Sequence, residues 1–438
     1  MFSGRKLTLL SFSLSTLTNG MLWITFSNIN SLAKDYFSVS GAEIDTLAVC
    51  FLIFYIPSSL FGLWIFTRFN LRVGILLGSG FTCIGGWLRY FSCIEDHSYS
   101  IVLFGQCLAA FAQPFLTNTP SKVAGRFFPT QERDLATAIL VLSNPTGIAL
   151  GTTLPSLFVS RNDGNVIEGM DSLLLFQASL STFAFGLVFS FFPNQPNSLT
   201  PHQSFTEDEE NFQEGFFPAL KLIRMQMNIC FSNPQFLTLF ISGSIGIGIF
   251  NTISTLLEQM VTPFCYDSQD ASLFSAGLLF SGLLSSVVVS FYLDQTKAYS
   301  QVLKLGNFFS FCMLFLISIF LRPGFKKELT ISFCFLGLFY IPMGPAIFQA
   351  LAETTFPCPE HISSFLVLSN AQILGIVFTY ILGIFIRDQE KNCVGFVYTT
   401  YSLILTLLGL LSLLPVLLFK GENKRLNVEL SHQLVEGG

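Results

Sequence analysis

The sequence predicts an all-α membrane protein of about twelve transmembrane helices, arranged as two six-helix halves. Of the 438 residues, 51% are hydrophobic and only 11% are charged, whereas soluble domains carry about 25% charged residues. Apolar runs of about 20 residues recur along the whole chain, and each is long enough to cross a hydrocarbon layer of about 30 Å. Backbone N–H and C=O groups cannot be left unpaired in lipid, so these runs must form helices.

The positions of the apolar runs predict where the spans lie along the chain. The predicted spans are near residues 7–31, 46–67, 73–93, 100–120, 135–158, 172–193, 235–259, 271–293, 301–321, 329–352, 362–386 and 394–419. The longest polar stretch falls between the sixth and seventh spans. The sequence therefore predicts four parts, which are an N-terminal six-helix half at 1–193, a cytosolic linker at 194–234, a C-terminal half at 235–420 and a cytosolic tail at 421–438.

The linker has two recognisable segments. Its acidic run, Glu207–Glu210, is typical of a solvated connection. Over residues 216–224, apolar side chains alternate with Lys221 and Arg224, a pattern that favours a short amphipathic helix on the membrane surface.

Lysine and arginine in short loops predict the orientation, because such loops are enriched in these residues on the cytosolic side. The residues that fall on one side are Arg5, Lys6, Arg68, Arg72, Lys122, Arg126, Arg133, Lys221, Arg224, Lys297, Lys304, Lys420, Lys424 and Arg425. Both termini are therefore expected in the cytosol, with the chain in the plasma membrane or an endomembrane. Arg322, Lys326 and Lys327 in the ninth loop go against the rule.

Composition excludes several classes of partner. The net charge of −5 leaves no basic face for nucleic acid. The four histidines are scattered over loops and the tail, so no metal site is expected. The cysteines lie mostly within apolar runs, which is typical of small core residues. No nucleophile, base and orienting group recur at a usable spacing, so we expect no enzyme activity and no cofactor. We expect the chain to be a monomer. Its expected partners are the lipid bilayer and a small-molecule solute.

Polar residues within the spans are the candidates for function, since such residues normally face a bundle interior or a cavity. Five sets share a helix face: Asn19 with Trp23; Gln106, Gln113 and Thr117; Asn144, Gly147 and Gly151; Asn251, Ser254, Thr255 and Glu258; and Gln372, Gly375 and Thr379. These stripes either line a central path or serve helix packing. For the Gly, Ser and Thr positions the sequence favours packing.

Ionisable residues deep in the spans are few. Arg89 lies near the outer end of the third span and Glu258 near the outer end of the seventh. A proton relay normally needs a chain of buried acids or histidines, so the sequence favours facilitated diffusion. Glu258 is the one candidate coupling residue, and the alternative is a water-exposed side chain at the end of its span.

Several collinear motifs resemble one transporter family. They are Gly78–Trp87, Gly105–Leu108, Pro120–Lys122, Ser254–Leu257 with Gln259 and Met260, Leu293–Lys297, Glu353–Pro357 and Asn370–Gly375. Together they identify residues 10–420 as similar to the feline leukaemia virus subgroup C receptor-related transporters of the major facilitator superfamily. The resemblance implies the major facilitator fold of two six-helix halves.

The sequence motif that the superfamily carries in the loop between spans two and three is only partly present in this chain, because Thr67 stands at its acidic position. The resemblance implies a gating role for Arg68 and Arg72, and for Asp294 and Lys297 in the matching loop of the second half. The alternative is that these four charges only set the topology.

The resemblance also implies a substrate site. Choline recognition in this family resembles an aromatic cage with polar helpers, as expected for a quaternary ammonium, which cannot donate hydrogen bonds. Trp23, Asn19, Asn144 and Gln372 match family positions. Pro145 stands in place of the family's fifth-span glutamine, and Asn251 in place of its seventh-span tyrosine. Gln113, from the fourth-span stripe, completes the candidate set.

The resemblance thus predicts a facilitative uniporter of a choline- or ethanolamine-like amine that works by alternating access. The alternatives are a carrier of pyridoxine, haem or another polar metabolite, and a transport-inactive membrane receptor or scaffold.

Overall fold

The computed structural model describes residues 4–95, 97–128, 130–159, 166–194, 225–355, 360–387 and 399–421. The chain divides into two compact units, unit 1 (Met1–Ala219) and unit 2 (Leu220–Gly438). The boundary along the sequence falls inside the polar stretch between the sixth and seventh spans. The acidic run, the predicted amphipathic helix at 216–224 and the tail beyond Gly421 lie outside the described residues.

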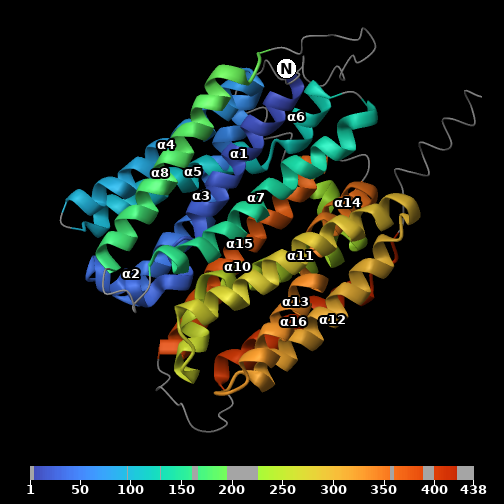
Figure 1. Ribbon diagram of the computed structural model, residues 1–438. Coiled ribbons are helices and arrows are strands. Elements are labelled where there is room, and N and C mark those ends of the chain that lie inside the picture. The colour runs from blue at the N-terminus through green and yellow to red at the C-terminus, as the bar shows by residue number, and fades with distance from the viewer. Residues whose placement is uncertain are drawn as a thin grey trace, which may run out of the picture. The chain divides into compact units, whose positions relative to one another are not determined.

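The elements of unit 1 are all helical in the described part of the chain (Figure 1). They are α1 (Gly4–Ile24), the 3-10 helix η1 (Ser27–Ile29), α2 (Asn30–Phe37), α3 (Gly41–Arg68), α4 (Leu71–Ile94), α5 (Tyr99–Thr117), α6 (Pro120–Phe127), α7 (Thr130–Phe158) and α8 (Val166–Phe191).

Unit 2 is built in the same way (Figure 1). Its described elements are α10 (Pro234–Val261), the 3-10 helix η4 (Thr262–Phe264), α11 (Ser268–Thr296), α12 (Tyr299–Phe320), α13 (Lys326–Tyr340), α14 (Met343–Thr355), α15 (Glu360–Arg387) and α16 (Thr400–Leu417).

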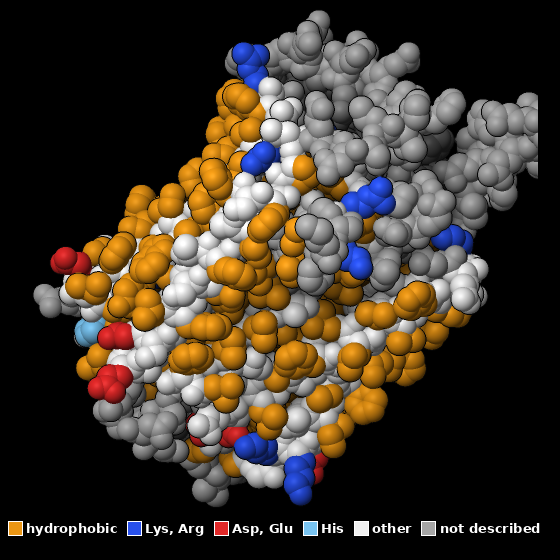
Figure 2. Space-filling model, turned by 45° about the horizontal axis from the view of Figure 1, so that its top comes forward, with side chains coloured by type: hydrophobic (Ala, Val, Ile, Leu, Met, Phe, Trp, Pro, Cys, Tyr) orange, Lys and Arg blue, Asp and Glu red, His pale blue; other side chains and the backbone are white. Residues whose placement is uncertain are grey.

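Twelve described segments are long and apolar enough to cross a membrane, which confirms the predicted number of spans. The first, Arg5–Phe37, joins α1, η1 and α2, and the tenth, Lys326–Thr355, joins α13 and α14. Hydrophobic side chains cover much of the face drawn in Figure 2, and charged side chains are few among them. This is the surface that a lipid environment requires.

The two units repeat one packing pattern. In unit 1, α1 packs against α7 and α8, α4 against α5 and α8, and α3 against α5. In unit 2, α10 packs against α15 and α16, α12 against α13 and α16, and α11 against α13. Each unit also has hydrophobic clusters of its own, centred on residues such as Leu173 and Phe12 in unit 1 and Leu239 in unit 2.

Local sequence signals start the helices. Ser40 and Glu43 form a capping box at the beginning of α3, where the Ser40 hydroxyl accepts from the Glu43 N–H and the Glu43 carboxylate accepts from the Ser40 N–H. Asp267 and Asp270 do the same for α11. These boxes satisfy N–H groups that would otherwise be unpaired at the two helix starts.

Candidate functional site

Asn19 lies in the C-terminal third of α1 and is fully buried. Its Nδ2 donates to Thr82 Oγ1 of α4 at 3.1 Å and to the Ala109 carbonyl of α5 at 2.8 Å, while its Oδ1 has no partner among the described residues. Asn19 therefore ties α1 to two neighbouring helices of unit 1, and its Oδ1 keeps capacity for one more donor.

Trp23 lies one turn further along the same face of α1 and is 4% exposed. Its indole Nε1 donates to the Ala48 carbonyl of α3 at 3.1 Å. The only polar group of the side chain, its indole N–H, is therefore satisfied by the protein, and the rest of the side chain is the apolar face of its ring. The hydrogen bond to α3 holds that face in one orientation.

Asn144 of α7 lies on the stripe that faces α1. Its Nδ2 is 3.5 Å from the Thr16 carbonyl, a long hydrogen bond. On the same stripe, a Cβ added to Gly147 would lie 2.0 Å from the Leu17 carbonyl oxygen, and one added to Gly151 would lie 2.5 Å from the Met21 oxygen. The two glycines therefore serve helix packing, as the sequence favoured, because only hydrogen fits between the backbones of α1 and α7.

The fourth-span stripe divides into two environments. Gln106 of α5 is fully buried, and its Nε2 donates to the Leu22 carbonyl at 3.0 Å and the Trp23 carbonyl at 3.3 Å. Gln113, two turns later, is partly exposed, and its side chain has no hydrogen-bond partner among the described residues. The Gln113 amide is therefore not used in packing by the described residues, whereas Gln106 belongs to the interior of unit 1.

In unit 2 the structure joins two of the predicted site residues directly. The Asn251 Nδ2 of α10 donates to Gln372 Oε1 of α15 at 3.0 Å, and the two side chains are 4% and 8% exposed. A second contact joins the same two helices, where the Thr379 hydroxyl of α15 lies 3.4 Å from the hydroxyl of Thr252, the residue after Asn251. Asn251 thus stands where it can share a hydrogen-bonding ligand with Gln372.

The predicted gating residues have different environments. Arg68 is exposed at the end of α3. Arg72 donates from Nη2 to the Phe189 carbonyl in the last turn of α8 at 2.9 Å, so its described partner is a helix end and not an acid. Lys297 caps α11 with a left-handed backbone, φ 51°, and its N–H bonds to the Leu293 carbonyl. The side chain of Asp294 lies outside the described residues.

Glu258 is buried at the end of α10, with 2% exposure, so it is not the water-exposed side chain that was the alternative expectation. Its Oε1 accepts a hydrogen bond from the Ser268 hydroxyl of α11 at 2.6 Å. Glu258 therefore lies at the corner where the chain passes from α10 into α11.

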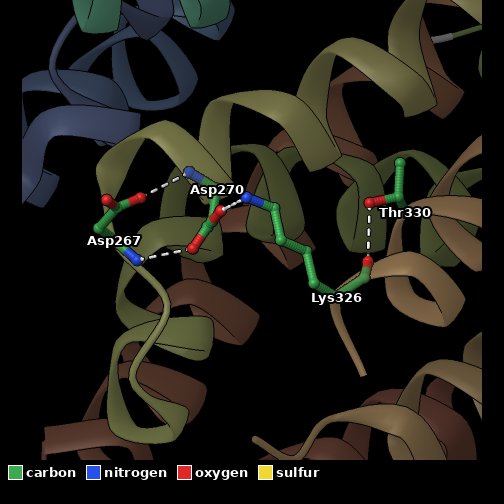
Figure 3. A network of polar contacts seen from close by, with 4 residues as sticks. All are labelled: Asp267, Asp270, Lys326 and Thr330. Atoms are coloured by element: carbon green, nitrogen blue, oxygen red, sulfur yellow. Dashed lines mark hydrogen bonds and ion pairs between the residues drawn. The ribbon is translucent and has the colours of Figure 1, made fainter. Parts of the chain in front are cut away.

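The start of α11 is bonded on several sides (Figure 3). Asp270 accepts from the Asp267 N–H and forms an ion pair with Lys326 at the start of α13. Tyr266 donates from its hydroxyl to the Arg322 carbonyl at 2.7 Å, and burial raises the pKa of Tyr266. Of the three charged side chains that depart from the loop-charge rule, Lys326 thus has an acidic partner here, and Arg322 contributes its backbone carbonyl.

One cysteine departs from the sequence expectation. Cys265, immediately after η4, is exposed and disulfide-bonded. The seven free described cysteines include Cys50, Cys107 and Cys334, which lie within spans. Among the described residues, no three His, Cys, Asp or Glu side chains are grouped as a metal site would require.

Several buried polar residues went unrecognised in the sequence. Asp45 of α3 is 4% exposed and accepts from Asn30 at 3.0 Å, and Tyr36 donates to Asp171 of α8 at 2.5 Å. Asp45 stands one residue before the predicted second span, so it looked like a loop residue. Gln177, a lone amide in an apolar run, was the signal that sequence reasoning missed.

Known proteins resemble this chain over most of its length. The family model of the Major Facilitator Superfamily matches residues 9–370. The choline/ethanolamine transporter FLVCR1 of Felis catus is 30% identical over 396 residues, which are 89% of this chain and 69% of the relative. The choline/ethanolamine transporter flvcr2a of Danio rerio is 30% identical over 390 residues, 87% of this chain and 81% of the relative.

A solved structure supports the fold. The D-xylose-proton symporter superposes with a TM-score of 0.73 at 12% sequence identity, covering 96% of this chain and 100% of the symporter. The sequence matches supply the family, because their identity is higher and their coverage includes both units. The chain belongs to the feline leukaemia virus subgroup C receptor-related transporters of the major facilitator superfamily, and is thus a multi-pass membrane transporter and not an enzyme.

Proposed function

We propose that the chain is a facilitative uniporter of a choline- or ethanolamine-like amine that works by alternating access. The observation that carries the proposal is its similarity, over 89% of its length, to a relative named a choline/ethanolamine transporter. The environment of Trp23 supports it. With the indole N–H already bonded to Ala48, the recognition element that remains is the π face of the ring, which attracts a quaternary ammonium.

The positions of buried acids support uniport over proton coupling. Asp45 lies in the first turns of α3 and Glu258 in the last turn of α10, so both stand at the ends of their spans. A proton relay needs ionisable groups through the middle of the membrane. We therefore expect transport down the solute gradient without an imposed pH gradient, with Glu258 as the residue to examine if coupling is found.

We further propose that both termini face the cytosol. The majority of loop charges supports this orientation, and the disulfide at Cys265 supports it independently. Disulfides persist in oxidising compartments and are rare in the cytosol, so the face that carries Cys265 should be extracellular or lumenal. The ion pair of Lys326 with Asp270 on that face gives one of the exceptional lysines a partner.

One observation favours a second substrate class. Asn251 replaces the family's tyrosine and is bonded to Gln372, so the second unit offers amide donors and acceptors in place of an aromatic ring. A neutral polar metabolite with hydroxyl groups would be recognised by such a pair. This alternative keeps the transporter fold and changes only the solute.

The test is uptake of labelled choline by purified protein in liposomes, measured for the wild type and for Trp23→Ala, Trp23→Phe and Asn251→Tyr. A cation–π contact of about 0.5–2 kcal/mol predicts a two- to about thirtyfold loss of affinity in Trp23→Ala. Trp23→Phe should keep part of the affinity, and Asn251→Tyr should raise it. The matched control is Trp87→Ala, which removes an indole bonded to Thr182 on α8.

The outcomes separate the two proposals. Unchanged choline affinity in Trp23→Ala contradicts the aromatic contact. Absence of choline uptake in the wild type, together with its appearance in Asn251→Tyr, would identify the neutral polar metabolite as the natural substrate class. Concentrative uptake that needs a pH gradient and disappears in Glu258→Gln would replace uniport by proton coupling.

A further inference from the structure

The first span is not one continuous helix. The helix α1 ends at Ile24, η1 begins at Ser27, and α2 continues from Asn30 to Phe37, all within one segment, Arg5–Phe37, that is long and apolar enough to cross a membrane. A helix end leaves the carbonyl groups of its last turn without amide partners. Leu22 and Trp23 in this last turn are buried, so their carbonyl oxygens need donors from the protein.

Two side chains from neighbouring helices supply the donors. Arg89 of α4 donates from Nη1 to the Leu22 carbonyl at 3.3 Å. Gln106 of α5 donates from Nε2 to the same carbonyl at 3.0 Å and to the Trp23 carbonyl at 3.3 Å. Both side chains are at least 99% buried, so the carbonyls are bonded to protein groups alone.

A third group extends this arrangement to α8. The Thr25 hydroxyl donates to the Met21 carbonyl at 2.9 Å. Gln177 of α8 donates from Nε2 to Thr25 Oγ1 at 3.0 Å, and its Oε1 accepts from Arg89 Nη2 at 3.0 Å. The end of α1 is therefore held by α4, α5 and α8 together.

The charge of Arg89 is balanced in an unusual way. Among the described residues Arg89 has no carboxylate partner, and its guanidinium carbon lies 4.9 Å from the centroid of the Phe26 ring. The helix dipole places partial negative charge at the C-terminal end of α1, which is where the guanidinium lies. A cation is therefore the better donor at this end, and a neutral side chain of the same length would lose both the charge and the hydrogen bonds.

We propose that Arg89 and Gln106 are positioning residues for Trp23, because they fix the point at which the first span breaks. Trp23 lies in the last turn of α1, its own carbonyl is bonded by Gln106, and its ring is oriented by Ala48. If the break moves, the indole moves with it. The inference rests on the proposed role of Trp23 in binding the amine, and it adds two residues that do not touch the solute.

The experiment uses the full chain with Trp64→Phe and Trp87→Phe, so that Trp23 is the sole tryptophan. Into this background we place Arg89→Met, Arg89→Lys and Gln106→Leu. Two quantities are measured for each variant in this background: the emission maximum of Trp23, and the KM and Vmax of choline uptake in liposomes. The matched control is Thr182→Val in the chain that keeps Trp64 and Trp87. There it removes another hydrogen bond between α4 and α8, that from Trp87, without touching the break, and it is read by KM and Vmax alone.

The expected result is a shifted Trp23 emission and a KM raised on the order of tenfold in Arg89→Met, since it removes hydrogen bonds from a charged donor. Gln106→Leu should change both readouts in the same direction by less. Arg89→Lys should keep part of the wild-type emission and KM. The lysine ammonium still interacts favourably with the negative end of the helix dipole, but it lacks the several N–H donors of the planar guanidinium. Thr182→Val, read for KM in the parent that keeps Trp87, should match its parent.

Other outcomes overturn the inference. A lowered yield or Vmax with unchanged Trp23 emission and KM in Arg89→Met and Gln106→Leu would show a merely structural role. If Arg89→Met does not fold, Arg89→Lys and Gln106→Leu decide the matter by the same two readouts. If the wild type takes up no choline, the proposed substrate fails, and the Trp23 emission of the variants still tests the positioning by Arg89 and Gln106.

Discussion

The close approach of α1 and α7 makes Gly147→Ala a sharp test of the packing. The added Cβ would lie 2.0 Å from the Leu17 carbonyl oxygen, 2.7 Å from its carbonyl carbon and 2.9 Å from its Cα. Real Cβ contacts essentially never fall below 3.0 Å, so the oxygen and the Cβ must separate by about 1 Å. All three atoms are backbone, so no side-chain rotation relieves the clash.

The expected cost is therefore that of overpacking, about 1–3 kcal/mol in the free energy of unfolding. The measurement is equilibrium unfolding of the purified protein in mixed detergent micelles, followed by intrinsic fluorescence. Because α1 carries Asn19 and Trp23, solute affinity should fall together with stability.

Gly186→Ala is the control. Gly186 lies in α8, and a Cβ added there meets nothing within 4 Å. Removing a helix glycine without a clash should leave stability unchanged or raise it by about 0.5–1 kcal/mol. Equal unfolding free energies for Gly147→Ala and Gly186→Ala would refute the close packing of α1 on α7.

Two further predictions concern unit 2. A double-mutant cycle of Asn251→Ala and Gln372→Ala should give a coupling of about 0.6–1.7 kcal/mol in unfolding free energy, as for other hydrogen bonds between membrane helices; additive single effects would contradict the bond. For Tyr266, burial raises the pKa, so the stability it contributes is complete below the unfolded value near pH 10 and is lost as the pH rises through the folded value. Thermal stability scanned from pH 8 to 11 should fall less steeply in Tyr266→Phe, and identical alkaline slopes would exclude this role.

The number and order of the spans were predictable because hydropathy is summed over a window of about 20 residues. The same summing hides irregularities within a span. The first span is predicted as one helix over residues 7–31, yet α1 stops at Ile24 and α2 begins at Asn30. The break depends on donors from Arg89 and Gln106, which lie far away in sequence, so no local signal announces it.

The candidate site was predictable in part. Helical spacing placed Asn19 and Trp23 on one face, and family resemblance selected Gln372, but neither indicates which amide is used for packing. The side-chain amide of Asn19 donates two hydrogen bonds, one to α4 and one to α5, and therefore serves packing. The side chain of Gln113 has no hydrogen-bond partner among the described residues. The disulfide of Cys265 was also missed, since a cysteine beside an apolar run has the same local pattern whether it is free or bonded.

The duplication of the six-helix arrangement has a consequence for how substrate choice can change. The aromatic candidate, Trp23, belongs to a unit that buries its own hydrophobic clusters, and the amide pair of Asn251 and Gln372 belongs to another such unit. A substitution in the amide pair perturbs the core of its own unit and leaves the core around Trp23 intact. On the proposed assignment of the substrate site, one half can therefore be altered toward a new solute while the core of the other half retains its packing.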